Sequence, residues 1–345
     1  MRTQTRNRTF ISFGMLIVTL GCGPWGGGRG ADRVVVYTAL DREFSEPLLL
    51  AQGERAGVEV LPKFDIESTK TVGLTRLILA ESAHPRCDLF WNNEILNTLR
   101  LHRKGLLEPF RPPGAADIPA AYKAKDGTWY GFAARARVLL VNTRLVAEAD
   151  RPTGIHDLTA PRWKGRIGLA KPLFGTTATH AACLFAAWGD AKARAFFEAL
   201  RSNQARVLSG NKQVARAVGS GEIAFGLTDT DDAVAELAAG NPVAIVYPDR
   251  RADQLGTLFI PNTLALIKGA PHRRAAEALA GLILSPDVEA ALARGPSAQI
   301  PLNPRVEVVP AVETPRTVHA MEVDFEAAAR LWDEVAAYLA STFAG

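Results

Sequence analysis

The sequence is poor in cysteine and lacks the common catalytic motifs. It has three cysteines, and two of them, Cys87 and Cys183, lie far apart with no CxxC pair. This spacing gives no disulfide framework, so we expect two buried free thiols. GxSxG, HExxH and P-loop motifs are absent, and the six histidines are dispersed. An exported hydrolase or lyase is therefore the least favoured function, and His180 is expected in the core or on a helix surface.

The chain also carries little net charge. The formal charge is +4 at pH 7, and Arg2, Arg6 and Arg8 supply three of these charges in an N-terminal stretch without acids. Beyond that stretch there is no block of Lys and Arg and no interleaving of aromatic and basic residues. We therefore expect no nucleic-acid partner. A hydrophobic content of 48% and a mean hydropathy of +0.02 are typical of a globular protein.

The apolar run near the N-terminus is too short for a permanent membrane span. Residues 1–22 have a basic start, an apolar stretch and then a glycine before Cys22, which predicts a signal peptide. A small residue before cysteine resembles a bacterial lipoprotein signal, in which Cys22 is acylated. The alternative is an ordinary signal peptide cleaved before Ala31. Residues 23–32 are predicted as a flexible tether, so we expect an exported protein on the periplasmic or cell-surface side, lipid-anchored at Cys22.

Strand-like and helix-like segments alternate after the tether, with no internal repeat. Strands are expected at 33–40, 58–64 and 87–93, with helices at 43–57, 71–84 and 94–105. This alternation predicts an α/β fold with parallel strands. The long apolar segment at 128–146 is expected to be extended and to lead into a second α/β unit.

This layout predicts two α/β lobes joined by extended crossover strands that act as a hinge. Lobe 1 is expected to comprise residues 33–133 and 259–310, and lobe 2 residues 134–258. Residues 311–345 are expected to form a helical segment packed on one lobe. Ligands of open α/β sheets bind beyond the carboxyl ends of the strands, so the cleft between the lobes is the predicted binding site.

Three acids follow the apolar run at 224–227. They are Asp229, Asp231 and Asp232, and two threonines accompany them. Asp and Thr are favoured N-caps, and acids in a first helical turn each contribute roughly 0.3–1 kcal/mol through the helix dipole. One residue suffices for a cap, and the mutual repulsion of three acids favours a compensating charge. Capping and ligand contact both remain open for these acids.

A second polar group precedes an alanine-rich helix. Gly175, Thr176 and Thr177 would present N–H groups and hydroxyls to an anion at a helix N-terminus, although simple N-capping explains them equally. Arg135 and Arg137 lie in the extended segment at 128–146. We expect one of them to be structural and the other to face the cleft, without an assignment of which.

Three segments are specific as a set: PRWKGRIG at 161–168, GNKQVARAVGSGE at 210–222 and PNTLALIKGAPH at 261–272. Together with weaker matches over nearly all of 33–310, they resemble the solute-binding proteins of bacterial ABC importers, in the branch that includes ferric-iron-binding proteins. The resemblance implies a two-lobe protein that captures a ligand and delivers it to a membrane permease and its ATPase. It also implies a monomer without enzymatic activity or a catalytic cofactor.

The resemblance places the family's iron ligands on residues that differ here. Its first-strand ligand falls at Asp41 and its carboxylate at Asn93 or Glu94, while its two iron-binding tyrosines fall at Thr230 and Asp231. A carboxylate-rich site thus replaces a phenolate-rich one. Carboxylates are hard ligands, suited to Fe³⁺, Mn²⁺ or Ca²⁺.

In the same branch, the loop that matches 175–177 holds a synergistic anion, with help from an asparagine that matches Asn211. The predicted ligand-binding residues are therefore Asp41, Asn93, Glu94, Arg137, Gly175, Thr176, Thr177, Asn211, Asp229, Thr230, Asp231 and Asp232, and the candidate metal ligands are Asp41, Glu94, Asp229 and Asp231. The expected ligand is a metal cation, Fe³⁺ or divalent, alone or with an anion. The alternatives are a small polar organic solute, such as an amine, phosphonate or sugar-like molecule, and a sensory module that reports to a membrane partner without transport.

Overall fold

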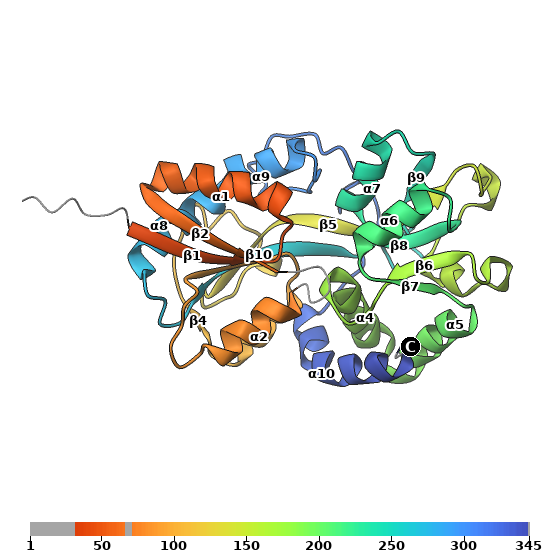
Figure 1. Ribbon diagram of the computed structural model, residues 1–345, viewed down its shortest axis with the longest axis horizontal. Coiled ribbons are helices and arrows are strands. Elements are labelled where there is room, and N and C mark those ends of the chain that lie inside the picture. Colours follow the sequence, from red (N-terminus) through yellow and green to blue (C-terminus); the bar gives the residue numbers. More distant parts are fainter. Residues whose placement is uncertain (1–31, 66–70, 344–345) are drawn as a thin grey trace, which may run out of the picture. The chain divides into compact units, whose positions relative to one another are not determined.

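The computed structural model describes residues 32–65 and 71–343. The predicted signal peptide, Cys22 and the tether up to residue 31 lie outside the described residues. Two α/β lobes lie along the long axis, and β5 (Trp129–Asn142) and β10 (Phe259–Ile267) run between them (Figure 1). This is the two-lobe α/β architecture that the sequence predicts.

The sheet of the first lobe is mixed. β1 (Asp32–Thr38) pairs in parallel with β2 (Val58–Phe64) and β3 (Leu89–Asn92). β10 runs antiparallel to β3, to β4 (Leu107–Glu108) and to the first half of β5. The alternation of strands and helices predicts parallel strands, and β5 and β10 depart from it because the chain crosses to the other lobe along one and returns along the other.

The sheet of the second lobe repeats this arrangement. β6 (Ile167–Ala170) pairs in parallel with β7 (Arg206–Leu208) and β8 (Phe225–Asp229). β8 and β9 (Val243–Val246) run antiparallel to the second half of β5. The shared strand β5 thus joins both halves into one continuous sheet of ten strands.

Helices cover both faces of this sheet. In the first lobe they are α1 (Arg42–Ala56), α2 (Val72–Ala80), α3 (Leu96–Arg103), α8 (Arg273–Ile283) and α9 (Pro286–Arg294). In the second they are α4 (Gly175–Trp188), α5 (Asp190–Ser202), α6 (Asn211–Gly219) and α7 (Thr230–Ala238). Short 3-10 helices occupy connections at Ala120–Tyr122, Glu148–Asp150, Ile155–Thr159 and Pro161–Trp163. Within residues 32–65 and 71–343, no helix has the length and apolar character of a membrane span.

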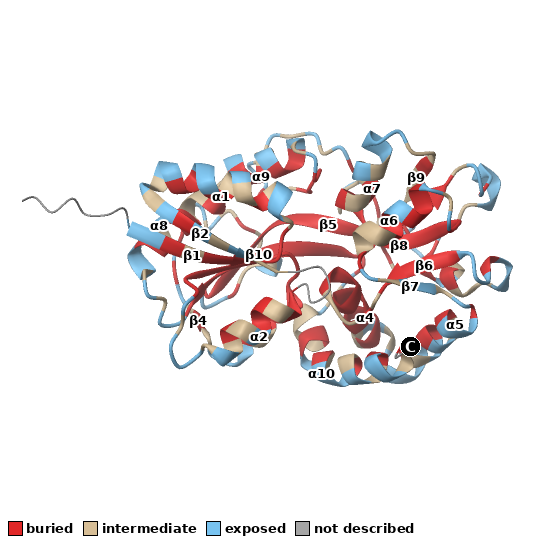
Figure 2. Cartoon of the chain, viewed as in Figure 1, coloured by how far each residue is buried: buried red, intermediate tan, exposed pale blue. Residues whose placement is uncertain are grey.

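The core lies against the central strands. Figure 2 shows the strands buried along most of their length, with the exposed positions on the outer faces of the helices. A strand covered on both faces is mostly apolar, and β10 is buried along its whole length, with Asn262 and Thr263 as its polar residues. Cys87 and Cys183 are buried and unbonded, which confirms the expectation of free thiols.

A β-bulge interrupts the crossing strands. The register of β5 and β10 shifts between Pro261 and Asn262, opposite Ala133, whose φ is 42°. The N–H of Ala133 donates to the buried carboxylate of Glu289, and the side-chain amide of Asn262 donates to the carbonyl oxygen of Ala133. The bulge falls at the predicted boundary between residues 133 and 134, although the exact limits of the lobes remain a prediction.

The C-terminal helix α10 (Phe325–Thr342) contacts both lobes. Arg100 of α3 forms an ion pair with Asp333 at 2.7 Å, and the hydroxyl of Tyr338 donates to the carbonyl of Arg194 in α5 at 3.2 Å. The sequence predicts an amphipathic helix on a single lobe. In the structure its apolar face packs on α3 and α4 together, because both helices expose apolar side chains on the same side of the sheet.

Candidate ligand-binding site

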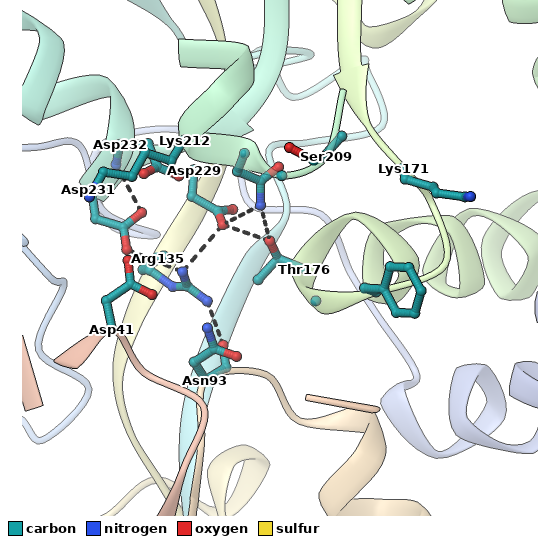
Figure 3. Close-up of a pocket in the computed structure, with 15 residues that line it drawn as sticks. Asp41, Asn93, Arg135, Lys171, Thr176, Ser209, Lys212, Asp229, Asp231 and Asp232 are labelled. Atoms are coloured by element: carbon teal, nitrogen blue, oxygen red, sulfur yellow. Dashed lines mark hydrogen bonds and ion pairs between the residues drawn. The ribbon is translucent and has the colours of Figure 1, made fainter. Parts of the chain in front are cut away.

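A small cavity lies where loops after several parallel strands meet (Figure 3). Asp41 and Asn93 come from the first lobe, Arg135 from β5, and the remaining residues from the ends of β6 and β8, the connections after β6 and β7, and the starts of α4, α6 and α7. The full lining is Asp41, Asn93, Arg135, Ala170, Lys171, Phe174, Gly175, Thr176, Ser209, Gly210, Asn211, Lys212, Asp229, Asp231 and Asp232. The cavity volume of about 20 Å³ leaves room for one or two water-sized species. The carboxyl ends of strands from both lobes therefore converge as predicted.

Asp229 is the centre of a dense hydrogen-bond network. Its carboxylate is 1% exposed and accepts from Arg137 Nη1 at 2.7 Å, Thr176 Oγ1 at 2.6 Å and Asn211 Nδ2 at 3.0 Å. Arg135 Nη1 lies 3.3 Å from its second oxygen. Burial alone would raise the pKa of Asp229, but Arg137 and Arg135 hold it below the ordinary value. The network keeps this carboxylate ionised.

Arg137 lies behind the cavity wall rather than in it. Its side chain is completely buried, and its Nη atoms donate to Asp229, to Thr176 and Thr177 at 3.1 Å each, and to Asn211 at 3.2 Å. Arg137 is therefore the structural member of the arginine pair. The sequence predicts it as a ligand contact, and the structure corrects this, because four protein oxygens already take up its guanidinium.

Arg135 is the arginine that lines the cavity. Its Nη1 contacts Asp231 at 3.1 Å and Asp229 at 3.3 Å, and its Nη2 donates to the carbonyl oxygen of Asn93 at 2.6 Å. Burial alone would lower the pKa of Arg135, but Asp231 and Asp229 raise it, so the guanidinium stays charged. Strand alternation places positions 135 and 137 on one face of β5, and only their position along the strand separates the two roles.

The three acids at the start of α7 do more than cap it. Asp229 occupies the N-cap position, yet its side chain makes no capping hydrogen bond. Asp231 Oδ1 accepts the N–H of Asp232 at 3.0 Å. Each of the three offers an oxygen within 4.8 Å of the other two, a spacing that could hold a metal ion. Figure 3 shows Asp41 approaching Asp231 from the other lobe.

Glu94 has a structural role instead of the predicted place in the cavity. It is completely buried and lies outside the lining. Its carboxylate accepts the N–H groups of Leu96 at 2.6 Å and Asn97 at 3.0 Å at the start of α3, and the hydroxyl of Thr179 in α4 at 2.7 Å. These donors leave its carboxylate engaged with α3 and with the second lobe.

The threonines of the predicted anion loop face inward. Thr176 Oγ1 donates to Asp229, and Thr177 Oγ1 donates to Asn211 Oδ1 at 3.0 Å. Thr230 is likewise buried, and its Oγ1 accepts the N–H of Ala136 at 3.2 Å. Gly175 and Thr176 line the cavity and Thr177 does not, while the hydroxyls of both threonines donate within the acid network.

One buried acceptor on the cavity wall has no protein partner. Asn93 is 1% exposed, and among the described residues its Oδ1 receives no hydrogen bond. Leaving a buried acceptor unpaired costs about 1–3 kcal/mol. The atom could accept a hydrogen bond from a solute or an ordered water, and ligand binding by Asn93 stays a prediction.

Lys171, Phe174 and Ser209 line the cavity although the sequence did not single them out. They follow β6 and β7, so the carboxyl-end rule applied to every strand would have found them. Lys212 also lines the cavity; it pairs with Glu43 of α1 at 3.0 Å and so connects the two lobes.

Residues 94–326 match the family of bacterial extracellular solute-binding proteins. The chain belongs to this family. It is a solute-binding protein and not an enzyme, and the cavity between its lobes is the candidate place for the solute.

Relatives of known name support the same fold. Iron uptake protein A2 of Synechocystis is 27% identical over 327 residues, which cover 90% of each chain. A ferric binding protein from Campylobacter jejuni superposes with a TM-score of 0.80 at 21% identity, covering 90% of this chain and 99% of that one. A periplasmic binding protein from Actinobacillus pleuropneumoniae with bound fructose-6-phosphate also gives 0.80, at 22% identity and with coverage of 90% and 98%. These likenesses confirm the two-lobe fold of the family.

Proposed function

We propose that the protein is the solute-binding component of an ABC importer and that its cargo is a small hard cation, Fe³⁺ or a divalent metal ion, alone or with an anion. The observation that carries this proposal is the group of Asp229, Asp231 and Asp232, whose carboxylates lie within 4.8 Å of one another on the wall of a small cavity. Oxygen ligands of this kind suit hard cations.

The size of the cavity favours an ion over an organic solute. About 20 Å³ holds one or two water-sized species, whereas pockets for organic ligands usually measure about 300–1,000 Å³. A sugar or a phosphonate would require the lobes to stand further apart.

The charge of the cavity favours a cation as well. Four acids line it. Of its three cationic side chains, Lys212 is paired with Glu43, and Lys171 points away from the acids in Figure 3. Arg135 donates hydrogen bonds to Asp229 and Asp231 of the group. A positively charged cargo would balance the remaining negative charge.

Two of the three relatives named above support an iron-like cargo, whereas the Actinobacillus protein, with bound fructose-6-phosphate, favours the organic alternative. The Synechocystis protein is an iron uptake protein, and the Campylobacter protein binds ferric ion. In this chain Thr230 and Asp231 occupy the positions that the ferric branch gives to tyrosines, so the ligand set would consist of Asp231, Asp232 and Asp41, with Asn93 as a neutral oxygen donor and Asp229 held in place behind them.

Transport follows from the position of the cavity between the lobes. A cation that touches Asp41 or Asn93 on one side and Asp231 on the other binds the closed form more tightly than the open form, and thereby shifts the population toward closure. A permease with its ATPase would recognise the closed form. The proposal includes export to the periplasmic or cell-surface side, a lipid anchor at Cys22 and a monomeric state.

The test uses protein from Ala31 onward, stripped with a chelator and then dialysed. Its thermal unfolding is recorded with ferric citrate, Mn²⁺, Ca²⁺ and a panel of organic phosphates, amines and sugars. A ligand that binds only the native state stabilises it by about 2.7 kcal/mol at a hundredfold excess over Kd. We expect a large shift with ferric citrate or a divalent metal, no shift with citrate alone, and reversal by chelator.

Matched variants sharpen this test. Asp231→Asn should abolish the metal-induced shift, whereas Asp333→Asn, at an aspartate whose side chain is 85% exposed outside the cavity, should leave it intact. Stabilisation by organic solutes alone would contradict the cation proposal and identify an organic-solute carrier of the same fold. Metal binding without any loss of uptake when the cognate permease gene is deleted would instead point to a sensory module.

The lipid anchor has its own test. We expect the wild-type chain to partition into membranes after processing and the Cys22→Ala variant to remain in the aqueous fraction. Membrane partition of the processed Cys22→Ala protein would contradict the lipoprotein assignment.

A further inference from the structure

We propose that Arg135 is a built-in competitor for the cargo: its guanidinium occupies oxygens that a bound cation needs, and so sets the affinity at a level from which the cargo can be released. This inference rests on the proposed cation-binding function. It assigns Arg135 a specificity- and affinity-determining role that its position on β5 alone does not reveal.

The contacts of Arg135 place its charge inside the acid group. Nη1 lies 3.1 Å from Asp231 Oδ2 and 3.3 Å from Asp229 Oδ2, and all three residues are at most 4% exposed. Figure 3 shows the guanidinium between these aspartates and Asn93. A cation that took Asp231 Oδ2 as a ligand would meet the guanidinium at close range, where two positive charges repel strongly.

The second half of the guanidinium ties the two lobes together. Nη2 donates to the carbonyl oxygen of Asn93 at 2.6 Å, so one side chain connects the loop after β3 with the start of α7. The Oδ1 atom of the same Asn93, on the cavity wall, is a buried acceptor that receives no hydrogen bond from residues 32–65 and 71–343. Asn93 Oδ1, next to Arg135, is therefore an oxygen that a cargo cation can contact when the guanidinium moves away from the acids.

Asp229 does not depend on Arg135 for its charge balance. Arg137 Nη1 holds Asp229 Oδ1 at 2.7 Å, while Arg135 approaches the other oxygen, Oδ2. Thr176 and Asn211 also donate to Oδ2. Removal of the Arg135 charge thus leaves the buried Asp229 paired, whereas Asp231 gains negative potential that a cargo cation can use.

The experiment measures cation affinity in four forms of the chelator-stripped protein. They are the wild type, Arg135→Gln, Arg135→Lys and the control Arg273→Gln, which removes one positive charge from an exposed ion pair with Glu108 outside the cavity. Mn²⁺ and ferric citrate are titrated into each. We expect Arg135→Gln to bind the active metal at least tenfold more tightly than the wild type, and Arg273→Gln to stay within twofold of it.

Arg135→Lys keeps the charge but offers a single ammonium, which cannot reach Asn93 and both aspartates together. We expect it to bind a few-fold more tightly than the wild type, so it tests the same competition if the glutamine variant fails to fold. Guanidinium chloride at low millimolar concentration should weaken binding to Arg135→Gln toward the wild-type value and leave the wild type unchanged. A purely structural role for Arg135 would not produce this rescue.

Two results separate the possible failures. If the wild type binds no metal by titration or thermal shift, the proposed function is wrong. If the wild type binds metal and both Arg135 variants bind it equally or more weakly, the competition is overturned, and Arg135 instead supports the bound state. Weaker binding that returns on addition of phosphate would show that Arg135 holds an anion which accompanies the metal.

Discussion

Asp229, at the end of the buried strand β8, is a buried carboxylate that its hydrogen-bond donors stabilise in the ionised form. A carboxylate that is 1% exposed is tolerated because charged and polar donors surround it. Thr176 and Asn211 come from helices far away in the chain, and their donors reach Asp229 at 2.6 and 3.0 Å. This dependence on distant partners explains why the sequence pattern alone left its role open between cap and ligand.

Asp229→Asn should destabilise the protein by about 3 kcal/mol near neutral pH, because Arg137 and Arg135 lose the charge that balances them. The pKa of Asp229 is lowered in the native state. The ionised Asp229 therefore adds to the free energy of unfolding at a pH above its unfolded-state pKa of about 4. This stabilisation is lost as the pH falls through its lower native-state pKa. Urea unfolding at pH 7 and pH 3.5 should show a gap to wild type that narrows in acid.

The comparison variant is Asp232→Asn, which changes a partly exposed acid of the same turn. We expect it to cost less than 1 kcal/mol. An equal cost for both variants would show that the Asp229 network carries no special stability.

His180 gives a second pH-dependent prediction. Burial, and then the charge of Arg137, lowers its pKa to about 3. Because an unfolded histidine titrates near 6.5, the unfolded state binds the extra proton between these values, and stability falls as the pH drops from about 6.5 toward 3, by roughly 1.4 kcal/mol per pH unit. His180→Gln should remove the part of this pH dependence that comes from the uptake of one proton on unfolding. Free energies of unfolding measured with denaturant from pH 7 to pH 4.5 check this. An unchanged slope in His180→Gln would contradict a buried neutral imidazole.

At the scale of elements, the N-termini of four helices form much of the site. α1, α4, α6 and α7 all begin at the cavity, so their unpaired N–H groups and positive dipole ends face it. Acids at such positions are favourable before any ligand is considered. The ligand-binding and capping interpretations of Asp229 and Asp231 therefore overlap physically. Glu94 shows the other outcome, because it satisfies the first N–H groups of α3 without lining the cavity.

Glu94→Ala should lower the free energy of unfolding by about 2–3 kcal/mol, since it removes a cap and leaves the hydroxyl of Thr179 without its acceptor. Cation affinity should stay within threefold of the wild type if Glu94 only positions α3. Denaturant unfolding and metal titration on the same sample check both parts. Loss of binding with retained stability would restore Glu94 as a ligand. Glu326→Ala, in the partly exposed first turn of α10, serves as the stability control.

At the scale of the whole molecule, the two lobes share β5 and are bridged by side chains. Lys212 pairs with Glu43, Arg135 bonds the carbonyl of Asn93, and α10 packs against both lobes. Closure therefore involves several weak contacts, of which the exposed ion pair contributes about 0–1 kcal/mol. Contacts of this size allow a cargo to change the balance between open and closed forms.

Spin labels at Leu50→Cys on α1 and Leu237→Cys on α7 can follow this balance. Both positions are exposed, at 47% and 44%, and the native Cys87 and Cys183 are buried. We expect the label distance to shorten, or its distribution to narrow, when the cognate metal is added to chelator-stripped protein. The same labels on an Asp231→Asn background should show no metal-dependent change. Identical distributions with and without metal in the otherwise wild-type protein would exclude cargo-driven closure.

The sequence by itself determined the order of strands and helices, the two-lobe α/β fold, the solute-binding family and the stretch of acids at 229–232. The elements and their order follow from hydrophobic periodicity and glycine stops, which act over a few residues, whereas the family follows from the resemblance of the segments at 161–168, 210–222 and 261–272. Only the tertiary structure decided the roles of the individual polar side chains. Arg135 and Arg137 share a face of one strand, yet one lines the cavity and the other is covered by Thr176, Thr177 and Asn211. Burial and hydrogen-bond partners, which arise from segments far apart in the chain, make that difference, and no local pattern records them.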